Sequence, residues 1–235
     1  LIDINQTREK IKKILNLNEF QLNNLSMAVA AAKICKLKEK KILNSLTKLK
    51  DVDGRMELVR TFPNNVKVYV DFAHTPDALL KTLHALGNTQ NKIISLVFGC
   101  GGDRDFKKRP IMAKIASKNC NKIYITDDNP RNEKPEKIRK EIIRNIKNKN
   151  CFNIGNRSKA IKTSILNAQP NEIILVAGKG HEIDQIYKNK SIFISDKQIV
   201  KKLKIKIKKK SNKEQTFLQN KQILKEIKKK IKIKS

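Results

Sequence analysis

The sequence is poor in residues that mark several common classes of protein. It has no tryptophan, only four cysteines, and 22 acidic residues against 53 lysines and arginines. The cysteines, Cys35, Cys100, Cys120 and Cys151, stand far apart without a Cys-x-x-Cys pair. This spacing indicates neither a zinc site nor a disulfide framework. We therefore expect four reduced thiols, in the core or on loops.

Long hydrophobic runs are also missing. The longest run of small apolar residues, Met27 to Ala32, is too short to span a bilayer. No charged-then-apolar signal segment stands at the N-terminus, and the chain begins at Leu1, not at Met. These features predict a cytoplasmic protein without a membrane span, and a fragment or trimmed product of a longer chain.

The net charge of +31 raises the alternative of a non-catalytic basic module that binds nucleic acid or membranes. Residues 201–235 contribute +13 of this charge, from 15 lysines and 2 acids, and the remainder is spread along the chain without a basic motif. We therefore expect a solvated basic surface and no specific nucleic-acid partner. Residues 204–235 are predicted to form a Lys-rich tail, helical or disordered.

Hydrophobic periodicity divides the rest of the chain into two parts. Helices are predicted over 8–17, 22–36 and 40–49, ahead of a hinge at Gly54-Arg55. From residue 66, strands and helices alternate, which is typical of a mainly parallel sheet covered on both faces. Strands are expected at 67–71, 92–98, 122–126, 151–153 and 172–177, helices at 76–86, 110–118, 135–147 and 158–168, and a hairpin at one edge over 185–188 and 190–194.

Four polar motifs follow these predicted strands. They are VDFAHTPDAL at 70–79, FGCGGDRD at 98–105 running on to KRP at 108–110, DDNPR at 127–131, and VAGKGHE at 176–182. Because the carboxyl ends of parallel strands meet at one edge of a sheet, we expect all four to line one crevice. An arginine fork beside an amide and an acid suits a small zwitterion, such as a free amino acid, although Asp-Asn-Pro is also an ordinary turn signal.

A phosphate-binding loop of the G-x-x-x-x-G-K-[ST] kind does not occur anywhere in the sequence. Neither the glycines at 99–102 nor Gly178-Lys179-Gly180 has the required spacing. Any nucleotide used at this site must therefore have its phosphates held mostly by residues outside the chain. We expect the chain alone to be incomplete as a catalyst.

In order and spacing, and with Gly54-Arg55-Met56-Glu57 ahead of them, these motifs resemble the C-terminal part of the muramyl (Mur) ligases, in particular members that add meso-diaminopimelate. The resemblance runs from about residue 20 to about residue 203. It implies that residues 1–53 are the C-terminal end of the central ATP-binding domain and that residues 54–203 are the C-terminal, amino-acid-binding domain. The implied fold is α/β, with a Rossmann-like, mainly parallel sheet flanked by helices and preceded by the helical end of the central domain.

The resemblance also implies an activity. It is that of an ATP-dependent amide ligase of peptidoglycan precursor synthesis, which joins meso-2,6-diaminopimelate to UDP-MurNAc-L-Ala-D-Glu through an acyl-phosphate intermediate. ATP and Mg²⁺ would be held mainly by the missing part of the central domain, and the enzyme would be a monomer. A sister ligase that adds L-lysine or another amino acid is the alternative within the enzyme class.

Site residues carry over position by position. The nucleotide-side positions are Asn24, Arg55, Asp71 and His74, although Gln21 stands where an asparagine is more usual. The positions implied to bind the incoming amino acid are Arg104, Asp128, Asn129, Pro130, Arg131, Gly178 and Glu182. Neither a catalytic general base nor a metal ligand can be named from the sequence.

Diaminopimelate differs from lysine by one carboxylate on its far carbon. Arg131 with Arg104 offers cations for that carboxylate, while Glu182 and Asp128 can accept hydrogen bonds from the distal ammonium. We therefore expect Arg131 to be the main selector between the two amino acids. The neighbouring Lys108 and Arg109 are expected to be solvated or to start a helix rather than to bind the ligand.

Overall fold

The computed structural model describes residues 3–15, 17, 19–50, 52–87, 93–147 and 150–204. The predicted Lys-rich tail lies outside these residues, apart from Lys204. All four cysteines are free thiols, and Cys100 and Cys120 are buried, in agreement with the sequence. Over the described residues, no helix has the length and apolar character needed to cross a membrane.

Three helices precede the hinge: α1 (Ile4–Lys12), α2 (Glu19–Ile34) and α3 (Glu39–Leu46). They share a small core of Ile11, Leu22, Val29, Ile42 and Leu46. The first helix begins four residues before the predicted start, because the side chain of Asp3 accepts a hydrogen bond from the backbone of Gln6 and caps it. The expected helical character of this segment is confirmed.

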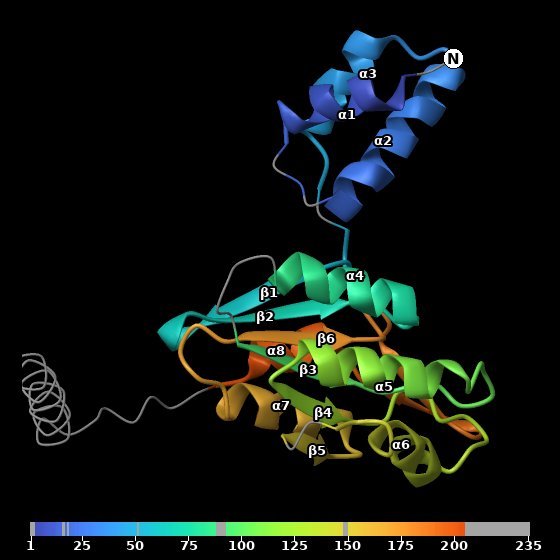
Figure 1. Ribbon diagram of the computed structural model, residues 1–235, viewed down its shortest axis with the longest axis vertical. Coiled ribbons are helices and arrows are strands. Elements are labelled where there is room, and N and C mark those ends of the chain that lie inside the picture. The colour runs from blue at the N-terminus through green and yellow to red at the C-terminus, as the bar shows by residue number, and fades with distance from the viewer. Residues whose placement is uncertain are drawn as a thin grey trace, which may run out of the picture. The chain divides into compact units, whose positions relative to one another are not determined.

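The α/β part contains a six-stranded sheet with the order β1-β2-β6-β3-β4-β5 (Figure 1). Only β1 runs antiparallel to its neighbour, so the prediction of a mainly parallel sheet is confirmed. Every residue of β3 and of β6 is buried, as expected for strands covered on both faces. The strands are β1 (Glu57–Phe62), β2 (Val66–Asp71), β3 (Ile94–Phe98), β4 (Lys122–Ile125), β5 (Cys151–Asn153) and β6 (Ile173–Ala177).

Helices cover both faces of this sheet (Figure 1). On one face lie α4 (Pro76–Gly87), α5 (Lys108–Asn119) and α6 (Pro135–Ile143), and on the other lie α7 (Arg157–Leu166) and α8 (Asp196–Lys202). Three leucines of α4, Met112 of α5 and Ile142 of α6 pack in one core with β3, β4 and β6; the leucines are Leu79, Leu83 and Leu86. This packing fixes the strand ends from which the polar loops emerge.

Three features differ from the sequence prediction. The edge strand β1 was not expected, because its sequence ELVRTF has mostly exposed or half-buried positions and no clear alternation. The seven-residue helix α8 was also missed; its start is capped by Ser195, which accepts from the backbone of Gln198. The predicted hairpin, β7 (Asp184–Tyr187) and β8 (Lys190–Phe193), forms a separate two-stranded sheet and not an edge of the main one.

Candidate functional site

A cleft of about 520 Å³ lies where β2, β3, β4 and β6 end. Because these strands are parallel neighbours in the sheet, the loops that follow them emerge at the same edge. Seven predicted site residues line the cleft: His74, Arg104, Asp128, Asn129, Arg131, Gly178 and Glu182. The four motifs therefore line one cleft, as the sequence predicts. Phe72, Gly99, Cys100, Gly101, Asp105 and Lys108 also belong to its lining.

The loop after β4 is held in shape by the strand β7. Gln185 is buried, and its Nε2 donates to the carbonyl oxygens of Asp127 and Asp128, at 3.0 and 2.6 Å. The carboxylate of Asp127 accepts from Arg139 and, at 2.9 Å, from the hydroxyl of Tyr187. Burial and the nearby Asp127 raise the pKa of the Tyr187 hydroxyl, so it stays a protonated donor. Asp127 is therefore part of the framework and not of the cleft.

Arg131 adopts a left-handed backbone conformation, with φ of 51°. This conformation is costly for a residue with a side chain, and two backbone hydrogen bonds hold it. The Arg131 amide donates to the carbonyl of Ile186 at 3.0 Å, and the amide of Lys188 donates to the carbonyl of Arg131 at 2.7 Å. The guanidinium donates to the carbonyl of Gly102 at 2.9 Å and to that of Asn129 at 3.3 Å, which holds it against the Gly-rich loop after β3.

Three acidic residues line the cleft: Asp105, Asp128 and Glu182. One oxygen of Asp128 accepts from the amide of Asn129 at 2.7 Å, and the other faces Gly178. A Cβ at Gly178 would lie 2.9 Å from that oxygen, and the φ of 113° there also disfavours a side chain. The glycine predicted from the sequence is thus needed to keep the Asp128 carboxylate open to the cleft.

The Gly-rich loop after β3 packs tightly on the loop after β4. A Cβ at Gly102 would lie 1.9 Å from the carbonyl oxygen of Pro130, which explains why this position is glycine. Pro130, a predicted site residue, is not among the residues that line the cleft. Arg104 is exposed on this loop and has no hydrogen-bond or ion-pair partner among the described residues. Its guanidinium is therefore available to a ligand carboxylate.

Arg109 stands at the start of α5, one of the two expected alternatives, and it is buried and not solvated. Its guanidinium donates to Glu133 and Glu141 and to the carbonyl oxygen of Gly101, the last at 3.1 Å. Glu133 in turn accepts from the amide of Asp103 at 2.8 Å. Arg109 is therefore bonded to the Gly-rich loop directly, at Gly101, and indirectly through Glu133. Lys108 is half-buried at the start of α5 and donates to the carbonyl of His74 at 2.8 Å.

On the nucleotide side predicted from the sequence, Asp71 is buried and its carboxylate is already engaged. It accepts from the amides of Met56 and Ala73, at 2.6 and 2.8 Å, and from the Thr82 hydroxyl at 3.3 Å. These bonds shape the start of the loop 71–75. A nucleotide contact by Asp71 stays a prediction, and the structure shows its role in local order.

Arg55 and His74 both contact the ring of Phe72. The guanidinium carbon of Arg55 is 4.5 Å from the centroid of that ring, and the His74 ring meets it edge-on at 4.6 Å. Both side chains are exposed, so each can reach a ligand. Asn24 is exposed on α2 and is not among the residues that line the cleft.

Cys100 lines the cleft but is not suited to be a nucleophile. Burial raises the pKa of its thiol to about 12, so it is protonated at neutral pH. Within the described part of the chain, no three residues of the His, Cys, Asp and Glu types gather closely enough to hold a metal ion.

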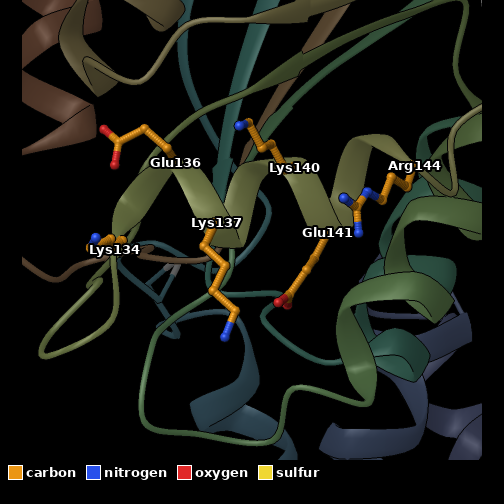
Figure 2. A pocket seen from close by; sticks show the side chains of 6 residues that line it. All are labelled: Lys134, Glu136, Lys137, Lys140, Glu141 and Arg144. Atoms are coloured by element: carbon orange, nitrogen blue, oxygen red, sulfur yellow. The ribbon is translucent and has the colours of Figure 1, made fainter.

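A different hollow, of about 360 Å³, runs along α6 (Figure 2). Its lining consists of charged side chains from α6 and its two ends: Lys134, Glu136, Lys137, Lys140, Glu141 and Arg144. It contains none of the predicted site residues. We therefore assign it to the solvated surface.

Two residues important to the site were not predicted, Lys179 and Gln185. Both are buried polar side chains that bond to the loop after β4. Lys179 lies inside the VAGKGHE motif, and its place between two glycines is the feature of the sequence that could have indicated a role in the site. Gln185 lies in the expected hairpin, and no local pattern distinguishes it from a surface residue.

A family model described as "Mur ligase, glutamate ligase domain" matches residues 54–180. The chain is 44% identical over 188 residues to the UDP-N-acetylmuramoyl-L-alanyl-D-glutamate--2,6-diaminopimelate ligase of Rickettsia montanensis, covering 79% of this chain and 38% of that protein. It is 44% identical over 185 residues to the protein of the same name from Buchnera aphidicola subsp. Acyrthosiphon pisum, covering 78% and 37%.

A solved structure of a ligase with this name is also similar, with a TM-score of 0.61 and 35% sequence identity. The match covers 79% of this chain and 38% of that one. The chain thus spans less than two fifths of the length of these relatives.

Proposed function

Because this chain belongs to the Mur ligase family, we propose that it forms the amino-acid-binding part of a ligase that adds meso-2,6-diaminopimelate to UDP-MurNAc-L-Ala-D-Glu in peptidoglycan precursor synthesis. The observation that carries the proposal is the charge content of the cleft. Its lining holds two arginines, Arg104 and Arg131, and two carboxylates, Asp128 and Glu182, from the loops that follow the strands, beside Asp105 and Lys108 near the start of α5. Diaminopimelate carries two carboxylates and two ammonium groups, so it can satisfy all four.

Lysine carries the same two ammonium groups but only one carboxylate. Bound in this cleft, lysine would leave either Arg104 or Arg131 without an anion. A site built to pair a charged group rejects an analogue that lacks the partner, because the unpaired group has been desolvated without compensation. Arg131 is the stronger candidate for the selector, since its backbone and guanidinium are both fixed, whereas Arg104 is exposed.

In this proposal ATP and Mg²⁺ are held mainly by the part of the enzyme outside this chain. ATP would supply the phosphoryl group that activates the carboxylate of the UDP-linked substrate. From this chain, Arg55 and His74 would reach the nucleotide from the rim of the cleft and Asn24 would contact it from α2, while Asp71 orders the loop that carries His74. The cleft residues would orient the amine of diaminopimelate for attack on the acyl phosphate.

The test is the amino-acid dependence of phosphate release by the full-length enzyme. We expect turnover with meso-diaminopimelate and little with L-lysine. Arg131→Ala should lower kcat/KM for diaminopimelate by about 100-fold, because removing one member of a desolvated charge pair costs about 2–5 kcal/mol. Arg144→Ala is the matched control, since Arg144 is exposed on the α6 hollow away from the cleft. Turnover with L-lysine at a similar rate, or an unchanged kcat/KM in Arg131→Ala, would refute the proposal.

A further inference from the structure

Lys179 is a lysine with no exposed side-chain surface, held between Gly178 and Gly180. Lysine is almost never fully buried unless it is paired. Its Nζ donates to Glu182 Oε2 at 3.2 Å, to Asn129 Oδ1 at 3.3 Å and to the carbonyl oxygen of Asp184. One ammonium group therefore joins the loop after β6, the loop after β4 and the first residue of β7.

The first consequence concerns the amide of Asn129. Its Oδ1 accepts from Lys179 Nζ and from the backbone amide of Ile186, the latter at 3.0 Å. An amide oxygen has two lone pairs, so both are used, and the identity of the two donors fixes which way the amide group is turned. The Nδ2 group then points to Glu182, 3.4 Å from its Oε2. Asn129 consequently offers the cleft a hydrogen-bond donor and not an acceptor.

The second consequence concerns the carboxylate of Glu182. Its Oε2 accepts from both Lys179 and Asn129. Its Oε1 has no hydrogen-bond partner among the described residues and remains for a ligand ammonium. Lys179 itself does not line the cleft, so it can act on a ligand only through these two side chains.

We propose that Lys179 is a positioning residue of the amino-acid site, which turns the donor group of Asn129 and the free oxygen of Glu182 toward the ligand. The inference rests on the proposed function for the identity of that ligand. The geometry itself, one buried ammonium bonded to two residues of the cleft, does not depend on it.

The kinetic test compares Lys179→Met with Lys122→Met in the full-length enzyme. Lys122 is a matched control because its Nζ also bonds to one carboxylate, Glu172, and one carbonyl, Asn167, but at the other end of the strands. We expect Lys179→Met to raise KM for diaminopimelate at least tenfold and to leave KM for ATP within twofold. Lys122→Met should change neither KM. An unchanged KM for diaminopimelate in folded Lys179→Met would overturn the proposal.

A ligand-free test uses the side-chain amide of Asn129 in NMR spectra of this chain. In the unchanged protein, nuclear Overhauser contacts should place the Nδ2 protons against Glu182, and Lys179→Met should shift these amide signals. Contacts that place the protons against the Ile186 amide would overturn the proposal without any variant. If the full-length enzyme ignores diaminopimelate, the proposed function fails, whereas the Asn129 signals still decide the role of Lys179.

Discussion

His181 stacks on Phe72, with ring centroids 5.5 Å apart and ring planes inclined by 29°. The contact joins the loop after β6 to the loop after β2. The same phenyl ring also contacts the guanidinium of Arg55 on its face and the ring of His74 edge-on. The residues that we propose for the nucleotide and the loop that we propose for the amino acid thus meet at one aromatic side chain.

Replacing His181 by alanine should therefore destabilise the protein. We expect a loss of about 0.5–1.5 kcal/mol in the free energy of unfolding, the usual worth of an aromatic pair beyond its buried area. His181→Phe should retain most of it, because a phenyl ring can occupy the same stacked position. The measurement is urea unfolding, with His84→Ala on the exposed face of α4 as the control. Equal losses in His181→Ala and His84→Ala would show that the stack contributes nothing.

The sheet and the meeting of the four motifs could be predicted because they follow from local patterns. The strands β3 and β6 are buried along their whole length, so their apolar runs are visible in the sequence, and parallel neighbours bring their loops to one edge. The long-range hydrogen-bond partners of a buried polar side chain leave no such pattern in the sequence. Gln185 bonds to backbone atoms 57 and 58 residues away, and nothing local indicates this.

Arg109 illustrates the same limit. It stands in a run of basic residues, Lys107 to Arg109, in which the sequence does not show which side chain turns inward. Its carboxylate partners, Glu133 and Glu141, come 24 and 32 residues later, from the loop before α6 and from α6 itself. Burial of a charged residue depends on such distant partners, so the sequence could not decide between a solvated Arg109 and a buried one at the start of a helix.

Gly54→Ala should be strongly destabilising. A Cβ at this position would lie 2.3 Å from the backbone nitrogen of His181, and the φ of 67° already disfavours a side chain. Backbone strain of this kind costs about 1–3 kcal/mol, and the backbone contact adds to it. Gly87→Ala is the control, since among the described residues its Cβ would come no closer than 3.6 Å to a neighbour, the side chain of Ile94. Chemical denaturation of both variants checks this, and similar stabilities would contradict the close packing of the hinge on the loop after β6.

Arg109→Met should reduce the dependence of stability on acid pH. The hydrogen bond from Arg109, helped by the amide of Asp103, holds the pKa of Glu133 below its usual value. A lowered pKa in the folded state means that the stabilisation is present above the unfolded pKa, near 4.3, and is lost as the pH falls through the folded value. Without the guanidinium the pKa of Glu133 returns toward its usual range, and this part of the acid-induced loss disappears.

The check is the free energy of unfolding measured between about pH 6 and pH 3. Arg109→Met should be less stable than the unchanged chain near neutral pH, with a shallower decline toward acid. Lys114→Met on the exposed side of the same helix should leave both the stability and the pH slope unchanged. Parallel pH curves for Arg109→Met and the unchanged chain would contradict the assigned role of the ion pairs.

Arg157 and Asp196 form an ion pair in which neither side chain is exposed, joining α7 to α8. The guanidinium also donates to the carbonyl of Ala177, at 3.0 Å, directly before Gly178 of the cleft. Asp196→Ala leaves a buried guanidinium without its anion and should cost about 3–5 kcal/mol. Asp77→Ala removes an exposed helical pair with Lys81 and should cost about 0.5 kcal/mol or less. Urea unfolding of both variants measures the contrast, and a small loss in Asp196→Ala would mean that water or another anion reaches Arg157.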